Sequence, residues 1–70
     1  MNQAEFKVEI TRKGYSSLSA YADHVGIPRK RFFAHLKTGN FTQSEIALFA
    51  KDLCLTVHRM YEIFFAAKVS

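Results

Sequence analysis

Three consecutive cations, Arg29, Lys30 and Arg31, directly precede two phenylalanines, Phe32 and Phe33, in the segment VGIPRKRFFAHLKTG. Clustered cations can neutralise phosphates, and an arginine can also pair with both major-groove acceptors of a guanine. An aromatic ring can pack on a thymine methyl group or anchor a protein partner. The function of the segment depends on whether its charges or its rings face the partner.

The net charge of +4 is concentrated in this part of the chain. All six acidic residues lie outside residues 24–44, whereas Arg29, Lys30, Arg31 and Lys37 lie inside that stretch. The acid-free stretch therefore carries the whole excess of positive charge, and the rest of the chain balances. A charge run is often only a solvated face, so its meaning depends on the elements that position it.

The cationic segment follows a predicted helix over about residues 17–25. Ser16 or Ser17 can cap its start through a hydroxyl oxygen. Gly26 marks its end, because glycine accepts the left-handed conformation that a helix C-cap requires. The apolar face of this helix has helical spacing and consists of Leu18, Tyr21, Ala22 and Val25.

A second helix is predicted over about residues 28–37, after a very short turn. Ile27 supplies an apolar anchor in the turn, and Pro28 suits the first helical turn, where its missing amide hydrogen is not needed. Consecutive residues on a helix are about 100° apart, so Phe32 and Phe33 cannot both face the core. We expect Phe32 and Leu36 inside, and Arg29, Lys30, Phe33 and Lys37 on the other side.

Two further helices are predicted after Gly39. Thr42 and Glu45 have the spacing of a capping box, and Ile46, Phe49, Ala50 and Leu53 form the core face that follows. A fifth helix is expected over residues 56–66. It begins at the candidate cap Thr56 and places Val57, Met60, Tyr61 and Phe64 inside and His58, Arg59 and Glu62 outside.

Residues 4–13 fit two patterns. Phe6, Val8 and Ile10 alternate as in a strand, whereas Phe6, Ile10 and Lys13 fit a helix that ends at Gly14. We predict a helix here. Cys54 lies in the apolar pattern ALFAKDLCL, so it is expected to be a buried, unreactive side chain.

The composition excludes several classes of function. Seventy residues with 49% hydrophobic content form one small domain, residues 1–70, in which a deep catalytic cleft is not expected. No glycine-rich phosphate loop and no histidine pair at metal-ligand spacing is present, so we expect no enzyme, no cofactor and no metal. The sequence lacks an apolar run of the roughly 20 residues that span a bilayer and lacks a signal-peptide pattern, which predicts a cytoplasmic protein without a membrane partner.

The segment LSAYADHVGIPRKRFFAHLKTG resembles the helix-turn-helix core of the lambda repressor and Cro (Xre-like) class of regulators, with Ala22, Gly26 and Ile27 at the characteristic positions. The later FTQSEIALFAKDLCLT and EIFF resemble the small Cro-like proteins of bacteriophages from Gram-positive hosts. The resemblance covers about residues 14–65. It implies an all-α, five-helix lambda repressor-like domain that acts as a transcription regulator, binds a double-stranded operator and influences the choice between lysis and lysogeny.

The resemblance also implies base contacts from the start of the second motif helix. The matching positions are Pro28, Arg29, Lys30 and Ala34, with Arg31 close enough to reach a phosphate. From its chemistry, Arg29 is the first choice for reading a guanine. Phosphate contacts are expected from Arg31, Lys37, Arg12 and Lys13. Ser16 and Ser17 either bind a phosphate at their helix start or serve only as caps.

Three roles remain open for Phe33: packing on a thymine methyl, partial burial against a neighbouring helix, or anchoring a protein partner. The last role defines an alternative function, in which Arg29, Lys30 and Phe33 bind the phage repressor protein and the chain acts as an antirepressor or modulator. Phe65, next to Phe64, either contributes to a homodimer or partner contact or helps to close the core.

Overall fold

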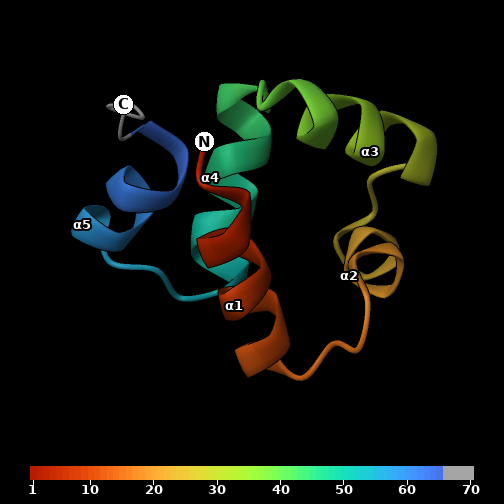
Figure 1. The fold of residues 1–70 in the computed structure, drawn as a ribbon. Helices are drawn as coiled ribbons and strands as arrows, with labels where there is room; N and C mark the ends of the chain where they lie inside the picture. Colours follow the sequence, from red (N-terminus) through yellow and green to blue (C-terminus); the bar gives the residue numbers. More distant parts are fainter. Residues whose placement is uncertain (66–70) are drawn as a thin grey trace.

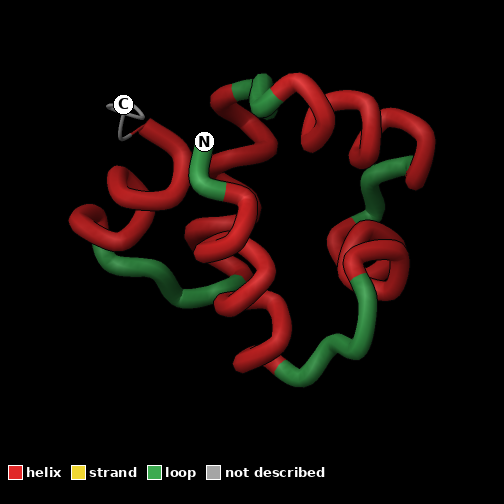
Figure 2. The backbone as a smooth tube through the Cα atoms, viewed as in Figure 1, coloured by secondary structure: helices red, strands yellow, loops and turns green. Residues whose placement is uncertain are grey.

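A computed structural model describes residues 1–65 of the chain, and within this range every regular element is helical (Figures 1 and 2). The elements are α1 (Gln3–Lys13), α2 (Leu18–Val25), α3 (Arg29–Thr38), α4 (Gln43–Asp52), α5 (Val57–Met60) and the π-helical turn η1 (Tyr61–Phe65). The predicted all-α class and the first helix are thus confirmed. Ala66, at the end of the expected fifth helix, lies outside the described residues.

The core is built around the fully buried ring of Phe6 on α1. Its centroid lies 5.1 Å from that of Phe49 on α4 and 5.3 Å from that of Phe64 on η1. Val8 is 40% exposed, because Phe6 and Ile10 share one helical face and the residue midway between them points outward. The other rings that meet Phe6 are Tyr21, Phe32 and Phe41.

The first four helices end in the same way. A residue just past each helix has a positive φ. Gly14 at 109°, Gly26 at 79° and Gly39 at 72° directly follow α1, α2 and α3, and Cys54 at 55° follows α4 after Leu53. In α4, the amide of Leu55 donates to the Ala50 carbonyl, and the amide of Cys54 donates to the Lys51 carbonyl. These are the two bonds of a Schellman motif. The expectation that Cys54 is buried was wrong, because α4 ends at Asp52 and the left-handed turn directs the thiol to solvent.

The connection between α2 and α3 consists of three residues. The Ile27 amide donates to the Ala22 carbonyl at 3.1 Å, and the Ile27 side chain is only 4% exposed. Pro28 has extended backbone (φ −53°, ψ 135°) and serves as the N-cap, so α3 begins one residue later than predicted. The buried turn residue fixes how α3 leaves α2.

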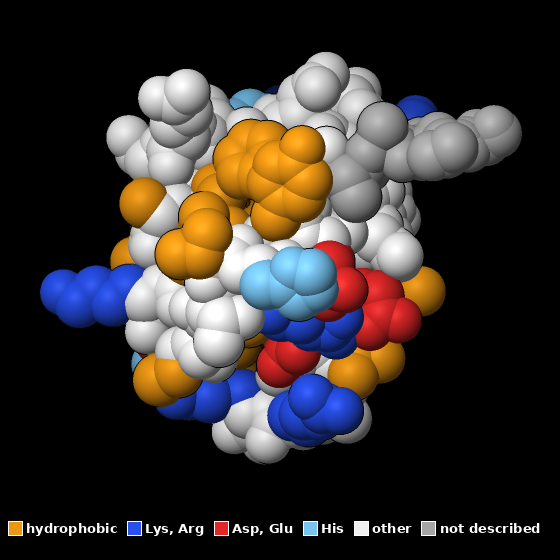
Figure 3. Space-filling view, turned by 90° about the vertical axis from the view of Figure 1, so that its left-hand side faces the viewer, with side chains coloured by type: hydrophobic (Ala, Val, Ile, Leu, Met, Phe, Trp, Pro, Cys, Tyr) orange, Lys and Arg blue, Asp and Glu red, His pale blue; other side chains and the backbone are white. Residues whose placement is uncertain are grey.

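The C-terminal helix differs from the prediction. Val57 is 77% and Tyr61 60% exposed, although both were expected inside, and Ile63, which was not expected inside, is fully buried. Phe64 is 8% exposed, as predicted. The predicted inward positions assumed one helix with 3.6 residues per turn. Instead Val57 begins a single α-helical turn, and residues 61–65 form a wider π turn, in which hydrogen bonds span five residues. The resulting surface carries apolar side chains next to a band of acids and cations (Figure 3).

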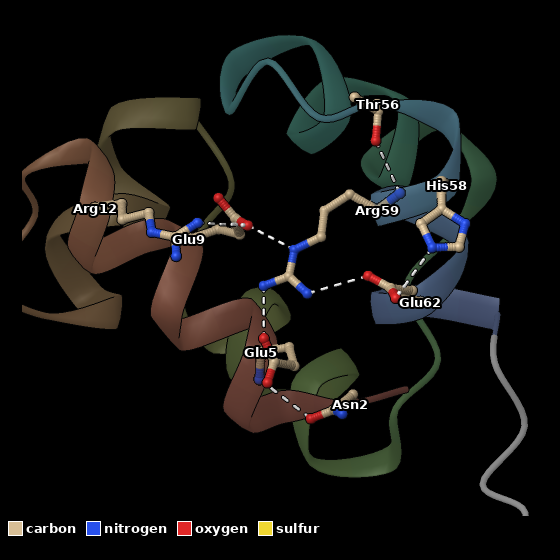
Figure 4. Close-up of polar contacts among 8 residues, drawn as sticks. All are labelled: Asn2, Glu5, Glu9, Arg12, Thr56, His58, Arg59 and Glu62. Carbon is tan, nitrogen blue, oxygen red and sulfur yellow. Dashed lines mark hydrogen bonds and ion pairs between the residues drawn. The ribbon is translucent and has the colours of Figure 1, made fainter.

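Arg59 joins this last segment to α1 (Figure 4). Its Nε donates to Glu9 Oε2 at 2.6 Å and its Nη2 to Glu5 Oε1 at 2.6 Å, while Nη1 reaches Glu62 at 3.3 Å. These bonds, from Glu9 first and then from Glu5, raise the pKa of Arg59 above its ordinary value. Arg59 was expected on the solvent side, but its side chain is only 23% exposed, because the acids of α1 draw it inward.

None of the helices between residues 1 and 65 combines the length and the apolar character needed to cross a bilayer.

Candidate nucleic-acid interface

The outward face of α3 carries four exposed residues, Lys30, Phe33, Ala34 and Lys37. Their spacing of three, four and seven residues places them in one stripe along the helix. We call them the α3 stripe. The opposite face is anchored by Phe32, fully buried, and Leu36, 7% exposed, as predicted. The core therefore fixes the direction in which the stripe points.

Phe33 is the apolar centre of the α3 stripe. Its side chain is 38% exposed, and its ring meets that of Phe32 edge to face, with centroids 5.3 Å apart. This ring contact is within α3 itself, and the exposed part of Phe33 is open to a partner.

Arg29 is held by an acid from the preceding helix. Its Nε donates to Asp23 Oδ1 at 3.0 Å, and its Nη2 donates to Asp23 Oδ2 at 2.6 Å. This pairing lowers the pKa of Asp23 and raises that of Arg29. The pair was not predicted, because Asp23 stands one residue outside the acid-free stretch in the sequence, whereas the short turn brings it to the start of α3.

A second acid binds the other flank of α3. Glu45 is 7% exposed, and its carboxylate lies 2.8 Å from His35 Nδ1 and 3.4 Å from Arg31 Nε. It also completes the predicted capping box, in which the Thr42 amide donates to Glu45 and the Glu45 amide to Thr42. Burial acts to raise the pKa of Glu45, but the bonds from the Thr42 amide and His35 outweigh it and lower the pKa.

The charge of α3 is consequently smaller than the linear sequence indicates. Asp23 and Glu45 flank the acid-free stretch and fold back to pair with Arg29 and Arg31. Among residues 1–65, no ion pair is formed by Lys30 or Lys37. Among the cations of α3, those without an acidic partner in the described part of the chain are therefore the two lysines of the α3 stripe.

The start of α3 has an unusual arrangement of charges. Asn2, Ser17, Thr42 and Thr56 each accept a hydrogen bond from an amide of the helix they precede, but Pro28 provides no side-chain cap. The first turn of α3 contains three cations and no acid, although the helix dipole favours negative charge there. This end of α3 suits an external anion.

The remaining predicted phosphate contacts lie before α2 and on α1. Ser17 caps α2 by accepting from the Ala20 amide at 3.1 Å, so its capping role is confirmed. Ser16 is exposed beside a shallow hollow of about 120 Å³ that Lys7 and Thr11 also line. Arg12 and Lys13 are exposed at the end of α1, with Arg12 lying 3.5 Å from Glu9.

Phe65 does not belong to the surface formed by Arg29, Lys30 and Phe33. It is 47% exposed on η1, and η1 and α3 lie on opposite sides of the molecule (Figure 1). Phe64 closes the core and Phe65 does not, so the four residues of the alternative partner surface do not form one patch.

A polar cluster joins α2 to α4. Asp52 accepts from the Tyr21 hydroxyl at 2.9 Å and lies 2.9 Å from His24 Nε2. Burial raises the pKa of Tyr21, and the bond to Asp52 adds to that effect. For Asp52 itself, burial raises the pKa, but the bonds from His24 and Tyr21 outweigh it and leave the pKa lowered. The sequence contains no signal for this long-range contact, which ties the C-terminal half of α2 to the end of α4.

Within residues 1–65, no three histidine, cysteine or acidic side chains gather in an arrangement that would hold a metal ion. Comparison with known protein families, with curated proteins and with solved structures finds no match for this chain.

Proposed function

We propose that this chain is a sequence-specific, DNA-binding transcription regulator of the phage Cro type, in which α2 and α3 form a helix-turn-helix and α3 enters the major groove of an operator. The observation that carries the proposal is the α3 stripe, an exposed face with a lysine toward each end and Phe33 and Ala34 between them. A helix is about 10–12 Å across, which matches a major groove about 12 Å wide.

The proposed mechanism divides the contacts by chemistry. Lys30 and Lys37, about 10 Å apart along the axis, bind phosphates at the two rims of the groove, and Lys30 can also reach a guanine. Phe33 and Ala34 pack on thymine methyl groups. Arg31 and the exposed Ser16, with the first amides of α2, add contacts to the backbone. No cofactor takes part.

Regulation follows from occupancy of a promoter. A two-fold symmetric operator would require two copies of the chain, with half-sites about 34–36 Å apart. Phe65 is exposed on η1, and η1 lies on the side of the molecule away from α3 (Figure 1). We propose Phe65 for such a contact.

The test is selection of duplexes from a randomised pool, followed by a salt titration on a selected duplex and on a scrambled one. Selective binding is expected, with log affinity falling against log salt by about 0.9 for each phosphate neutralised. Equal affinity for both duplexes at every salt concentration would reject the proposal.

The exposure of Phe33 beside Lys30 favours one second candidate, a modulator that binds the phage repressor protein. Aromatic side chains dominate binding hot spots. In that case the chain alone would bind DNA without selectivity, would release the repressor from its operator, and would lose this effect in Phe33→Ala while remaining folded.

A further inference from the structure

The Asp23–Arg29 pair joins the last turn of α2 to the first residue of α3 across the turn at Gly26. Both side chains are accessible, 53% and 60% exposed. Exposed ion pairs contribute little to stability. Each residue also has the less favourable sign for its own helix end, since Asp23 lies near the negative end of α2 and Arg29 at the positive end of α3. Helix stability does not account for the pair.

The geometry leaves part of the guanidinium unused. Arginine has five N–H donors in a planar fork. Asp23 takes one from Nε and one from Nη2, so both donors on Nη1 and one on Nη2 remain. The remaining Nη1 and Nη2 donors form the end of the fork, which matches the O6 and N7 acceptors of a guanine.

We propose that Asp23 is a specificity-determining residue, which holds Arg29 by its Nε–Nη2 edge so that the Nη1–Nη2 end is presented to one guanine of the operator. This inference rests on the proposed DNA-binding function. Arg29 remains the reader of the base, and Asp23 is the positioning residue. An arginine fixed before binding loses less side-chain freedom in the complex.

The Asp23 carboxylate also affects the overall affinity for DNA, which it lowers. Asp23 places a negative charge on a surface that faces phosphates, so it weakens attraction to every duplex. Its removal should therefore tighten binding to scrambled DNA and weaken discrimination at one base pair. If Asp23 had a purely structural role, its removal would reduce the affinity for scrambled DNA and the discrimination at that base pair together.

The experiment compares wild type, Asp23→Ala and Arg29→Ala on the duplex selected by the wild type, on duplexes with each base pair changed, and on scrambled DNA. Wild type should prefer guanine at one position by about 5- to 150-fold. In Asp23→Ala this preference should fall below about threefold, while affinity for scrambled DNA rises by about three- to tenfold, the effect of one near-surface charge. Arg29→Ala should abolish the same preference.

The matched control is Glu62→Ala, which removes an exposed acid on η1, away from α3, and should leave the guanine preference unchanged. Asp23→Asn, which retains one acceptor, should give an intermediate preference and replaces the alanine variant if that variant fails to fold. A selective wild type whose guanine preference survives in the Asp23 variants overturns the inference and leaves the proposed function standing. A wild type without any preferred sequence overturns both.

Discussion

His35 Nδ1 lies 2.8 Å from Glu45 Oε1, and this contact joins the outer helix α3 to the first turn of α4. The same carboxylate oxygen accepts from the Thr42 amide at 2.9 Å. One buried acid thus caps α4 and ties down the flank of the helix whose opposite side is exposed. The orientation of the α3 stripe depends on Glu45 as well as on the core.

Replacement of Glu45 should separate these two roles. Glutamine can retain the capping-box bond but carries no charge, so Glu45→Gln is expected to lower the free energy of unfolding by about 1 kcal/mol, and Glu45→Ala by about 2 kcal/mol. Urea unfolding monitored by circular dichroism measures both values.

The lowered pKa of Glu45 adds a dependence on pH. A carboxylate whose pKa is lower in the folded state stabilises above its unfolded pKa, about 4.3, and loses that contribution as the pH falls through the folded value. The difference between wild type and Glu45→Gln should therefore narrow as the pH is lowered from 6 toward about 3. If the difference in unfolding free energy between wild type and Glu45→Gln stayed constant over this pH range, the Glu45 charge would not be stabilising.

Arg59 provides the second tie between distant segments. Arg59→Ala should lower the free energy of unfolding by about 1–2 kcal/mol, because it leaves the carboxylate of Glu9 at α1 without its closest partner. Arg59→Lys should recover only part of this loss, since an ammonium cannot bridge several carboxylates with a planar fork.

Urea unfolding at low and at high salt measures the effect of Arg59, which should shrink in 1 M salt because the site is partly exposed. Arg12→Ala is the control: Arg12 is 71% exposed and lies 3.5 Å from the same Glu9, so its loss should change the unfolding free energy by less than about 0.5 kcal/mol. Equal losses for the two arginines would reject the assignment.

The interior of α2, α3 and α4 could be predicted from the sequence. Residues such as Phe32, Leu36 and Phe49 recur at the spacing of a single helical face, and burial follows that period directly. In the last segment the same rule misplaced Val57, in α5, and Tyr61, in η1. From residue 61 onward a π turn changes the angular spacing, and no residue in that segment signals it. Cys54 was misplaced because it lies just past the end of α4 in the left-handed conformation that glycine adopts after α1, α2 and α3.

The candidate interface could be predicted only in part. The direction of Lys30, Phe33 and Lys37 follows from helical spacing. The pairing of Arg29 with Asp23 does not, because a count of charges along the chain contains no information on which acids a turn brings back. The expected excess of positive charge was located correctly in sequence but is partly neutralised in space.

The lysines of the α3 stripe should affect all DNA sequences alike. Lys37→Ala is expected to weaken binding to selected and scrambled duplexes by a similar factor and to reduce the salt slope by about 0.9, because one phosphate contact is lost. The control Lys51→Ala also removes one positive charge, but from the last turn of α4 and not from α3. It should leave the salt slope unchanged. A salt titration that gives both variants the same slope would exclude α3 as the phosphate-binding helix.

Cys54 gives the sharpest test of the fold. In the left-handed region, a residue with a Cβ atom is destabilised by about 1–2 kcal/mol through steric contact. Glycine lacks this contact but loses more backbone entropy on folding, which offsets about 0.5–1 kcal/mol of the gain. Cys54→Gly should therefore raise the free energy of unfolding by about 0.5–1 kcal/mol, seen as an increase of a few degrees in Tm. Cys54→Ala removes the exposed thiol but keeps the Cβ atom at φ 55°, so it should bring no such gain. Equal stabilisation by glycine and alanine would show that the thiol, and not the backbone, limits stability at the end of α4.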